Sequence, residues 1–112
     1  MRERGFIAVY MMASGYNGTL YTGVTSDLWL RVWQHKHGVF EGFSKQHGCT
    51  GLVWFEPFLT LPPAFLRETR IKGWRRQWKL DLIHADNTHW RDLAADWYDE
   101  TVNRWLLDPE NP

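Results

Sequence analysis

The sequence has little of what secreted and membrane proteins carry. Its 112 residues include one cysteine, Cys49, so no internal disulfide can form. No apolar run approaches the roughly 18 residues that span a membrane. Residues 1–4 and the strand-like run after them lack the apolar core and cleavage site of a signal peptide. We therefore expect one small domain in a reducing, cytoplasmic setting, without membrane association.

The sequence also lacks net charge, because 13 basic side chains balance 13 acidic ones. The distribution is uneven, however: residues 1–85 carry a balance of +5 and residues 86–112 a balance of −5. Phosphate binding depends on the local field, so a neutral total does not exclude nucleic acid. The candidate phosphate-binding residues lie in one helical stretch: Arg67, Arg70, Lys72, Arg75, Arg76 and Lys79. Their plainer interpretation is a solvated basic face.

Aromatic residues are abundant, with 8 Trp, 6 Phe and 4 Tyr. Each buried ring removes roughly 150–250 Å² from water, so few residues suffice for a core. Two strands are expected over residues 5–12 and 19–24, each with a tyrosine, joined through Asn17-Gly18, a dipeptide typical of hairpin turns. A third strand is expected over residues 52–59, with Val53, Phe55 and Leu59 facing inward.

Three or four helices complete the pattern. Thr25-Ser26-Asp27 offers N-cap side chains and Gly38 a left-handed end, so a helix is expected over residues 27–37. Residues 38–50 are expected to form a loop. Pro62-Pro63 begins the next helix, and Gly73 either kinks it or joins two helices. A final helix is expected from about residue 93 to 107.

The expected fold is therefore mixed α/β (α+β), with a three-stranded antiparallel sheet flanked by helices in the order ββαβαα plus a C-terminal helix. Residues 1–93 form the main part. Residues 94–112 form an acidic helical extension of the same domain. Two roles are open for this extension: it covers the basic helix, or it mediates self-association through Trp97 and Trp105.

Several chemically capable side chains follow the hairpin in order. Tyr10 and Tyr21 lie on the two strands, Arg31 and His35 are four apart on the first helix, and Glu68 is the single acid between Glu56 and Asp81. Each has an ordinary alternative. Strand tyrosines commonly pack in a core, a lone histidine is often structural, and Glu68 can pair with Lys72 on the helix surface.

The ordered set Val9-Tyr10-Met11, Tyr21-Thr22-Gly23, Arg31, His35 and Glu68 resembles the GIY-YIG nuclease superfamily, especially its small stand-alone bacterial members. Two longer strings strengthen the resemblance, Trp74-Arg75-Arg76-Gln77-Trp78-Lys79 and Trp90-Arg91-Asp92-Leu93. The resemblance implies a metal-dependent DNA endonuclease active in repair or processing. No base-reading motif is present, so branched, single-stranded or end structures are expected substrates rather than a sequence.

The resemblance also implies roles for single residues. One of Tyr10 and Tyr21 acts as general base while the other orients water or phosphate, and we favour Tyr21 as the base. Arg31 stabilises transition-state charge, and His35 orients water, shares the base role or protonates the leaving oxygen. Glu68 holds Mg²⁺ or Mn²⁺. The implied nucleic-acid contacts are Gly23, Ser44, Lys45 and the six basic residues of the helical stretch.

Two departures from the family pattern motivate an alternative. Thr22 replaces the usual isoleucine, and Val24 stands where many relatives have lysine. Either Lys45 or Lys72 supplies the missing cation, or the chain is a catalytically weak or inactive nucleic-acid-binding module.

A third hypothesis treats the chain as a zinc-stabilised interaction protein. It rests on the pattern H-x-H…H-x-C, formed by His35, His37, His47 and Cys49.

Overall fold

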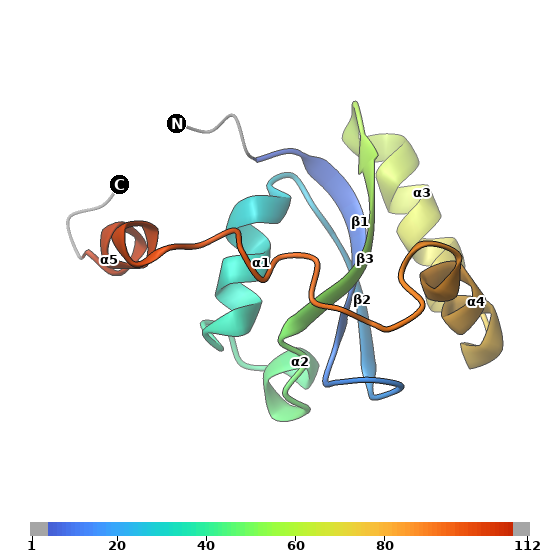
Figure 1. Cartoon of the computed structure of the whole chain (residues 1–112). Helices are drawn as coiled ribbons and strands as arrows, with labels where there is room; N and C mark the ends of the chain where they lie inside the picture. The colour runs from blue at the N-terminus through green and yellow to red at the C-terminus, as the bar shows by residue number, and fades with distance from the viewer. Residues whose placement is uncertain (1–4, 109–112) are drawn as a thin grey trace.

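The fold is a three-stranded antiparallel sheet with helices on both faces (Figure 1). The structure, a computed structural model, describes residues 5–108. Its strands are β1 (Ile7–Ala13), β2 (Leu20–Thr25) and β3 (Gly51–Phe58), in the spatial order β2-β1-β3. The central strand β1 pairs antiparallel with both neighbours. The predicted fold class is confirmed.

The helices are α1 (Leu28–Lys36), α2 (Phe43–Gln46), α3 (Leu61–Lys72), α4 (Arg76–Asp86) and α5 (Glu100–Leu107). The one-turn helix α2 lies inside the stretch expected to be a loop. Gly73 follows α3 as its C-cap, so it joins two helices rather than kinking one. The final helix starts at Glu100 instead of residue 93, because the preceding residues bond to β3 and Asp99 caps the helix.

The ends of α1 follow the predicted chemistry. The Asp27 carboxylate accepts a hydrogen bond from the Leu30 amide at 3.1 Å, which satisfies one free N–H of the first turn. At the other end Gly38 has a φ of 59°, and the Val39 amide donates to the Gln34 carbonyl at 3.0 Å. These contacts fix where the helix starts and stops.

Two apolar clusters lie on opposite faces of the sheet, because successive side chains of β1 alternate between them. The cluster facing α1 contains Ala8, Tyr10, Met12, Leu28, Val32, Cys49, Leu52 and Ala94. The cluster facing α3 and α4 contains Val9, Met11, Ala13, Val53, Trp54, Ala64, Ile71, Ile83 and Trp90. Leu59, expected to face inward, is 98% exposed because β3 ends one residue earlier.

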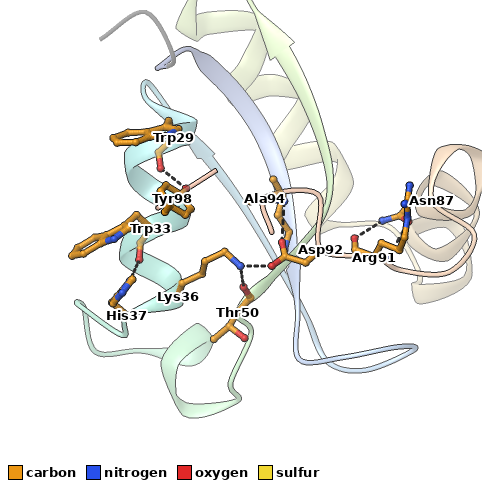
Figure 2. Close-up of polar contacts among 11 residues, drawn as sticks. Trp29, Trp33, Lys36, His37, Thr50, Asn87, Arg91, Asp92, Ala94 and Tyr98 are labelled. Atoms are coloured by element: carbon orange, nitrogen blue, oxygen red, sulfur yellow. Dashed lines mark hydrogen bonds and ion pairs between the residues drawn. The ribbon is translucent and has the colours of Figure 1, made fainter. Parts of the chain in front are cut away.

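An irregular segment, residues 87–99, crosses the outer edge of β3 from α4 to α1, and we call it the strap (Figures 1 and 2). The Leu93 amide donates to the Leu52 carbonyl at 2.7 Å, and the Asp92 carboxylate accepts from the Leu52 amide at 3.0 Å. The same carboxylate pairs with Lys36 of α1. The strap therefore occupies polar groups that an edge strand otherwise leaves open.

The helix α5 lies beside α1, at the opposite end of the molecule from α3 and α4 (Figure 1). None of its side chains is buried, and the Trp33 indole donates to the Asn103 amide oxygen at 2.8 Å. The described acidic segment therefore does not cover the basic helix, which was one of its two expected roles. None of the described helices has the length and apolar character to cross a membrane.

Candidate active site

The sheet register places both tyrosines on the face that carries α1. Tyr10 lies opposite Gly23, whereas Tyr21 lies opposite Met12, two residues farther along the same strand. Side chains at i and i+2 share a face, so the two phenols become diagonal neighbours. Their ring centroids are 6.3 Å apart.

Gly23 makes this arrangement possible. A Cβ atom at this position would lie 2.6 Å from the Tyr10 hydroxyl oxygen, well inside van der Waals contact. The phenol of Tyr10 thus lies over the glycine backbone of β2. Gly23 is itself buried, and its place in the fold is beneath Tyr10.

One turn of α1 supplies Arg31 and His35. The His35 Nε2 atom is 2.7 Å from the Tyr10 hydroxyl, and its ring centroid is 5.0 Å from that of Tyr21. Burial, with a further contribution from the Arg31 charge, lowers the pKa of His35 to about 4. The imidazole is therefore neutral at neutral pH.

Tyr10 is a buried phenol, with 1% of its surface exposed. Burial raises its pKa well above the ordinary value, and the neighbouring Tyr21 and Glu68 raise it further, while Arg31 acts in the opposite direction. Tyr10 consequently keeps its proton near neutral pH, and a neutral His35 can accept that proton in a hydrogen bond.

A cleft of about 240 Å³ opens beside these residues. Tyr21, Arg31 and His35 line it, together with Ser44 and Lys45 of α2. Phe40 and Phe43 also line it, and both are about half exposed, at 59% and 48%. The Arg31 guanidinium lies 5.8 Å from the Phe40 ring centroid, a cation–π distance.

Glu68 lies on α3, outside the lining of this cleft. Its side chain is only 14% exposed and pairs with Lys72 at 2.6 Å. The ion pair with Lys72, which was the ordinary alternative to a metal-binding role for Glu68, is thus present. The Glu68 carboxylate is nevertheless less exposed than a pair on the helix surface implies. Its charge also raises the pKa of Tyr10, which links Glu68 electrostatically to the tyrosine site.

The six candidate phosphate-binding residues have different environments. Arg67 pairs with Glu56 at 2.9 Å, and Arg76 donates to the Asn17 and Gly18 carbonyls of the hairpin turn at 3.0 and 2.8 Å. The Arg75 guanidinium lies 4.6 Å from the Trp78 ring centroid.

The other three also differ from one another: Arg70 is exposed, Lys79 is partly exposed, and Lys72 binds Glu68. Several basic side chains of this stretch therefore already bind partners within the protein.

Lys45 and Lys72, the two candidates to replace the lysine that many relatives have at position 24, both form ion pairs. Lys45 lines the cleft and binds Glu41 at 2.7 Å, and Lys72 binds Glu68. Val24 itself packs against the cluster that faces α3 and α4, on the opposite side of the sheet from the tyrosines.

The zinc hypothesis is wrong for the part of the chain that the structure describes. Among residues 5–108, no group of three or more His, Cys, Asp or Glu side chains could hold a metal. His35 bonds to Tyr10, His37 donates to the Trp33 carbonyl, and Cys49 is fully buried with its thiol directed to the Thr19 carbonyl. His35, His37 and Cys49 therefore have separate structural partners.

Sequence reasoning missed six residues that line the cleft: Gln34, Gly38, Phe40, Glu41, Gly42 and Phe43. Of these, Gln34 had a signal, since it is three residues from Arg31 on the same helix. Ser44, expected to contact DNA, is 9% exposed and lies 2.9 Å from the His35 Nδ1 atom. No sequence pattern connects these two residues.

Comparison with known proteins identifies the family. Residues 6–81 match the family model described as the GIY-YIG catalytic domain. Over 67 residues the chain is 37% identical to a UPF0213 protein of Staphylococcus epidermidis and 39% identical to UPF0213 proteins of Staphylococcus saprophyticus and Staphylococcus aureus, covering 60% of this chain and 82% of each relative. No solved structure gives a significant match. The chain therefore belongs to the GIY-YIG family.

Proposed function

We propose that this protein is an endonuclease that hydrolyses DNA phosphodiester bonds with Mg²⁺ or Mn²⁺. The observation that carries the proposal is the convergence of Tyr21, Arg31 and His35 on one cleft, with Tyr10 buried directly behind them. The family to which the chain belongs is a nuclease family, described by its catalytic domain. The residues at the cleft and the family both support an endonuclease that recognises DNA structure. We place its action in the cytoplasm, in DNA repair or processing.

Glu68 is the residue that would hold the metal. Mg²⁺ keeps several water ligands and needs only one or two carboxylates besides substrate phosphates, so a single carboxylate such as Glu68 suits it. The electrostatic effect of Glu68 on Tyr10 supports a place beside the reacting groups. When bound, the metal supplies Lewis-acid stabilisation of phosphate charge.

The two tyrosines have different parts in the proposed reaction. Tyr10 is buried, keeps its proton and donates a hydrogen bond to His35, so it is a poor acceptor for a proton from water. Tyr21 is partly exposed and lines the cleft, where it can meet water and substrate. We assign Tyr21 as the group that takes or relays the proton of the attacking water.

Arg31 and His35 act on the substrate side of the cleft. The planar guanidinium of Arg31 can bind two phosphate oxygens and stabilise the charge of the pentacovalent transition state. Neutral His35 holds Tyr10 in place and lies against the ring of Tyr21. Arg70 and Lys79, both solvent-accessible, are proposed to bind the DNA backbone outside the cleft.

The test compares Glu68→Gln with a matched acid, Glu56→Gln. Each substitution removes one carboxylate that pairs with a basic side chain, Lys72 or Arg67. Labelled branched, single-stranded and duplex DNA are incubated with Mg²⁺, Mn²⁺ or EDTA. We expect EDTA to abolish cleavage and Glu68→Gln to lower its rate at least ~100-fold, because a metal ligand is lost.

The control and the binding data separate the alternatives. Glu56→Gln is expected to cleave within about threefold of the wild type, because a partly exposed ion pair contributes little. Glu68→Gln should still bind DNA. Binding by the wild type without cleavage in either metal would instead support the nucleic-acid-binding module, for which the core position of Val24 is the structural argument.

A further inference from the structure

We propose that Ser44 is a positioning residue that fixes the tautomer of His35 and thereby makes Tyr10 a hydrogen-bond donor. The proposal deepens the function proposed above and rests on it for its catalytic consequence. Its basis is a hydrogen-bonded chain of four groups, from the Cys49 carbonyl through Ser44 and His35 to Tyr10.

The direction of each bond in this chain follows from its first member. The Cys49 carbonyl oxygen can only accept, so the Ser44 hydroxyl, 3.3 Å away, donates to it. The Ser44 oxygen, having used its proton, accepts from the His35 Nδ1–H at 2.9 Å. A neutral imidazole carries one proton, so the His35 Nε2 atom is the acceptor for the Tyr10 hydroxyl at 2.7 Å.

Local structure holds Ser44 in this role. The Ser44 carbonyl accepts from the Cys49 amide at 2.9 Å, while the Ser44 hydroxyl donates to the Cys49 carbonyl. Ser44 and Cys49 are thus joined by two reciprocal bonds across the end of α2, and Cys49 is fully buried. Ser44 itself is 9% exposed, which makes it a poorly placed contact for DNA.

The tautomer of His35 affects the cleft because it sets how the Tyr10 hydroxyl can hydrogen-bond. A phenol that donates to His35 keeps only acceptor capacity on its oxygen. The neighbouring Tyr21, whose ring centroid is 6.3 Å away, therefore faces an acceptor rather than a competing donor. With the opposite tautomer, His35 would present an N–H to Tyr10 and this polarity would be reversed.

The tautomer is measured directly by long-range ¹H–¹⁵N NMR of the imidazole, which distinguishes a protonated Nδ1 from a protonated Nε2. For the wild-type chain at neutral pH we expect His35 as the Nδ1–H tautomer. Ser44→Ala should shift His35 toward the Nε2–H form, and Ser44→Thr, which keeps the hydroxyl, should retain the wild-type pattern. Ser26→Ala, at an exposed serine, is the control and should leave the spectrum unchanged.

An Nε2–H tautomer in the wild type overturns the proposal, and that measurement needs no variant. An unchanged His35 spectrum in folded Ser44→Ala overturns it as well. The NMR result is independent of nuclease activity, so a failure of the proposed function, seen as absent cleavage by the wild type, remains distinguishable.

Kinetics test the catalytic consequence. For Ser44→Ala we expect kcat to fall at least tenfold with KM within about twofold of the wild type, and Ser44→Thr to recover most of the activity. A DNA-contacting role for Ser44 makes the opposite prediction, a raised KM with unchanged kcat. That pattern would contradict the positioning role.

Discussion

At the scale of single residues, the two tyrosines differ because of where their strands lie in the sheet. Tyr10 belongs to the central strand β1 and is buried between α1 and β2, whereas Tyr21 belongs to the edge strand β2 and reaches the cleft. Burial raises the pKa of Tyr10, so the phenol keeps its proton and donates a hydrogen bond to His35. The preference for Tyr21 as the base, open at the level of sequence, thus gains a physical reason.

Gly23→Ala tests the packing of Tyr10 over β2. The added methyl would lie 2.6 Å from the Tyr10 hydroxyl oxygen and 2.7 Å from its Cζ atom, so the Tyr10 ring must shift from its position. Overpacking of this kind costs typically about 1–3 kcal/mol. We expect urea denaturation to show a loss of unfolding free energy in this range, accompanied by a weaker Tyr10–His35 hydrogen bond.

The control for this substitution is Gly15→Ala. A Cβ atom at Gly15 would meet no heavy atom within 4 Å, and the residue is exposed in the hairpin turn. We expect a change below about 0.5 kcal/mol, as for most surface substitutions. Equal effects of the two substitutions would show that the contact with Tyr10 is not what requires glycine at position 23.

The sequence could bring some candidate residues together but could not predict their contacts. Arg31 and His35 could be placed together because helical periodicity is regular over one turn. The bond between Ser44 and His35 could not be predicted, because it depends on how the segment after Gly38 returns to α1. The contact between Gly23 and Tyr10 needs the strand register, which the hairpin turn alone does not fix.

At the scale of elements, predictions succeeded where local chemistry determines an end. The limits of α1 depend on Asp27 and Gly38, both read directly from the sequence. The start of α5 was missed because residues 93–99 contact β3 and α1 instead of continuing a helix, and that tertiary competition has no local signal. The string Trp90-Arg91-Asp92-Leu93, part of the family resemblance, proves to belong to the strap.

Asp92→Ala tests how strongly the strap is held. The carboxylate accepts from the Leu52 amide and the Ala94 amide, both at 3.0 Å, and pairs with Lys36 (Figure 2). Removing it leaves a part-buried ammonium and two amide donors without this partner. Hydrogen bonds to charged groups contribute about 1.5–3 kcal/mol each, although not additively, so we expect a loss of about 2–4 kcal/mol in urea denaturation.

Asp96→Ala is the matched control, an exposed aspartate four residues farther along the strap. It is expected to change stability by less than about 0.5 kcal/mol. Hydrogen exchange adds a local readout, because Asp92→Ala should lower the protection of the Leu52 amide more than that of the β1 amides. Uniform loss of protection across the sheet would contradict a specific role in holding the strap.

At the scale of the whole molecule, charge and packing divide the chain at different places. The helices α3 and α4, which hold five of the six candidate phosphate-binding residues, lie at the opposite end of the molecule from α5 (Figure 1). The change in charge balance after residue 85 had left open that the acidic segment covers the basic helix, and the position of α5 excludes that role for the described residues. The charge balance did not predict the end of the packed core, since Ala94 is fully buried and Trp97 and Tyr98 pack against the cluster facing α1.

Two truncations distinguish the packed part of the C-terminal segment from α5. A chain of residues 1–99 loses a helix with no buried side chain and the bond from Trp33 to Asn103, so we expect its unfolding free energy to fall by less than about 1.5 kcal/mol. A chain of residues 1–93 also loses Ala94, Trp97 and Tyr98. Exposing part of the core beneath them should cost at least about 3 kcal/mol in urea denaturation.

A comparison of the full chain with residues 1–99 tests the proposal that α5 mediates self-association. This helix leaves Trp105 42% exposed and Leu107 65% exposed at the end of the molecule far from α4. Because association through these side chains would bury apolar surface, sedimentation velocity should show a dimer for the full chain and a monomer for residues 1–99. If the folded full chain and the folded chain of residues 1–99 sediment identically, α5 is not the contact between copies. If residues 1–99 are as unstable in urea as residues 1–93, α5 belongs to the core.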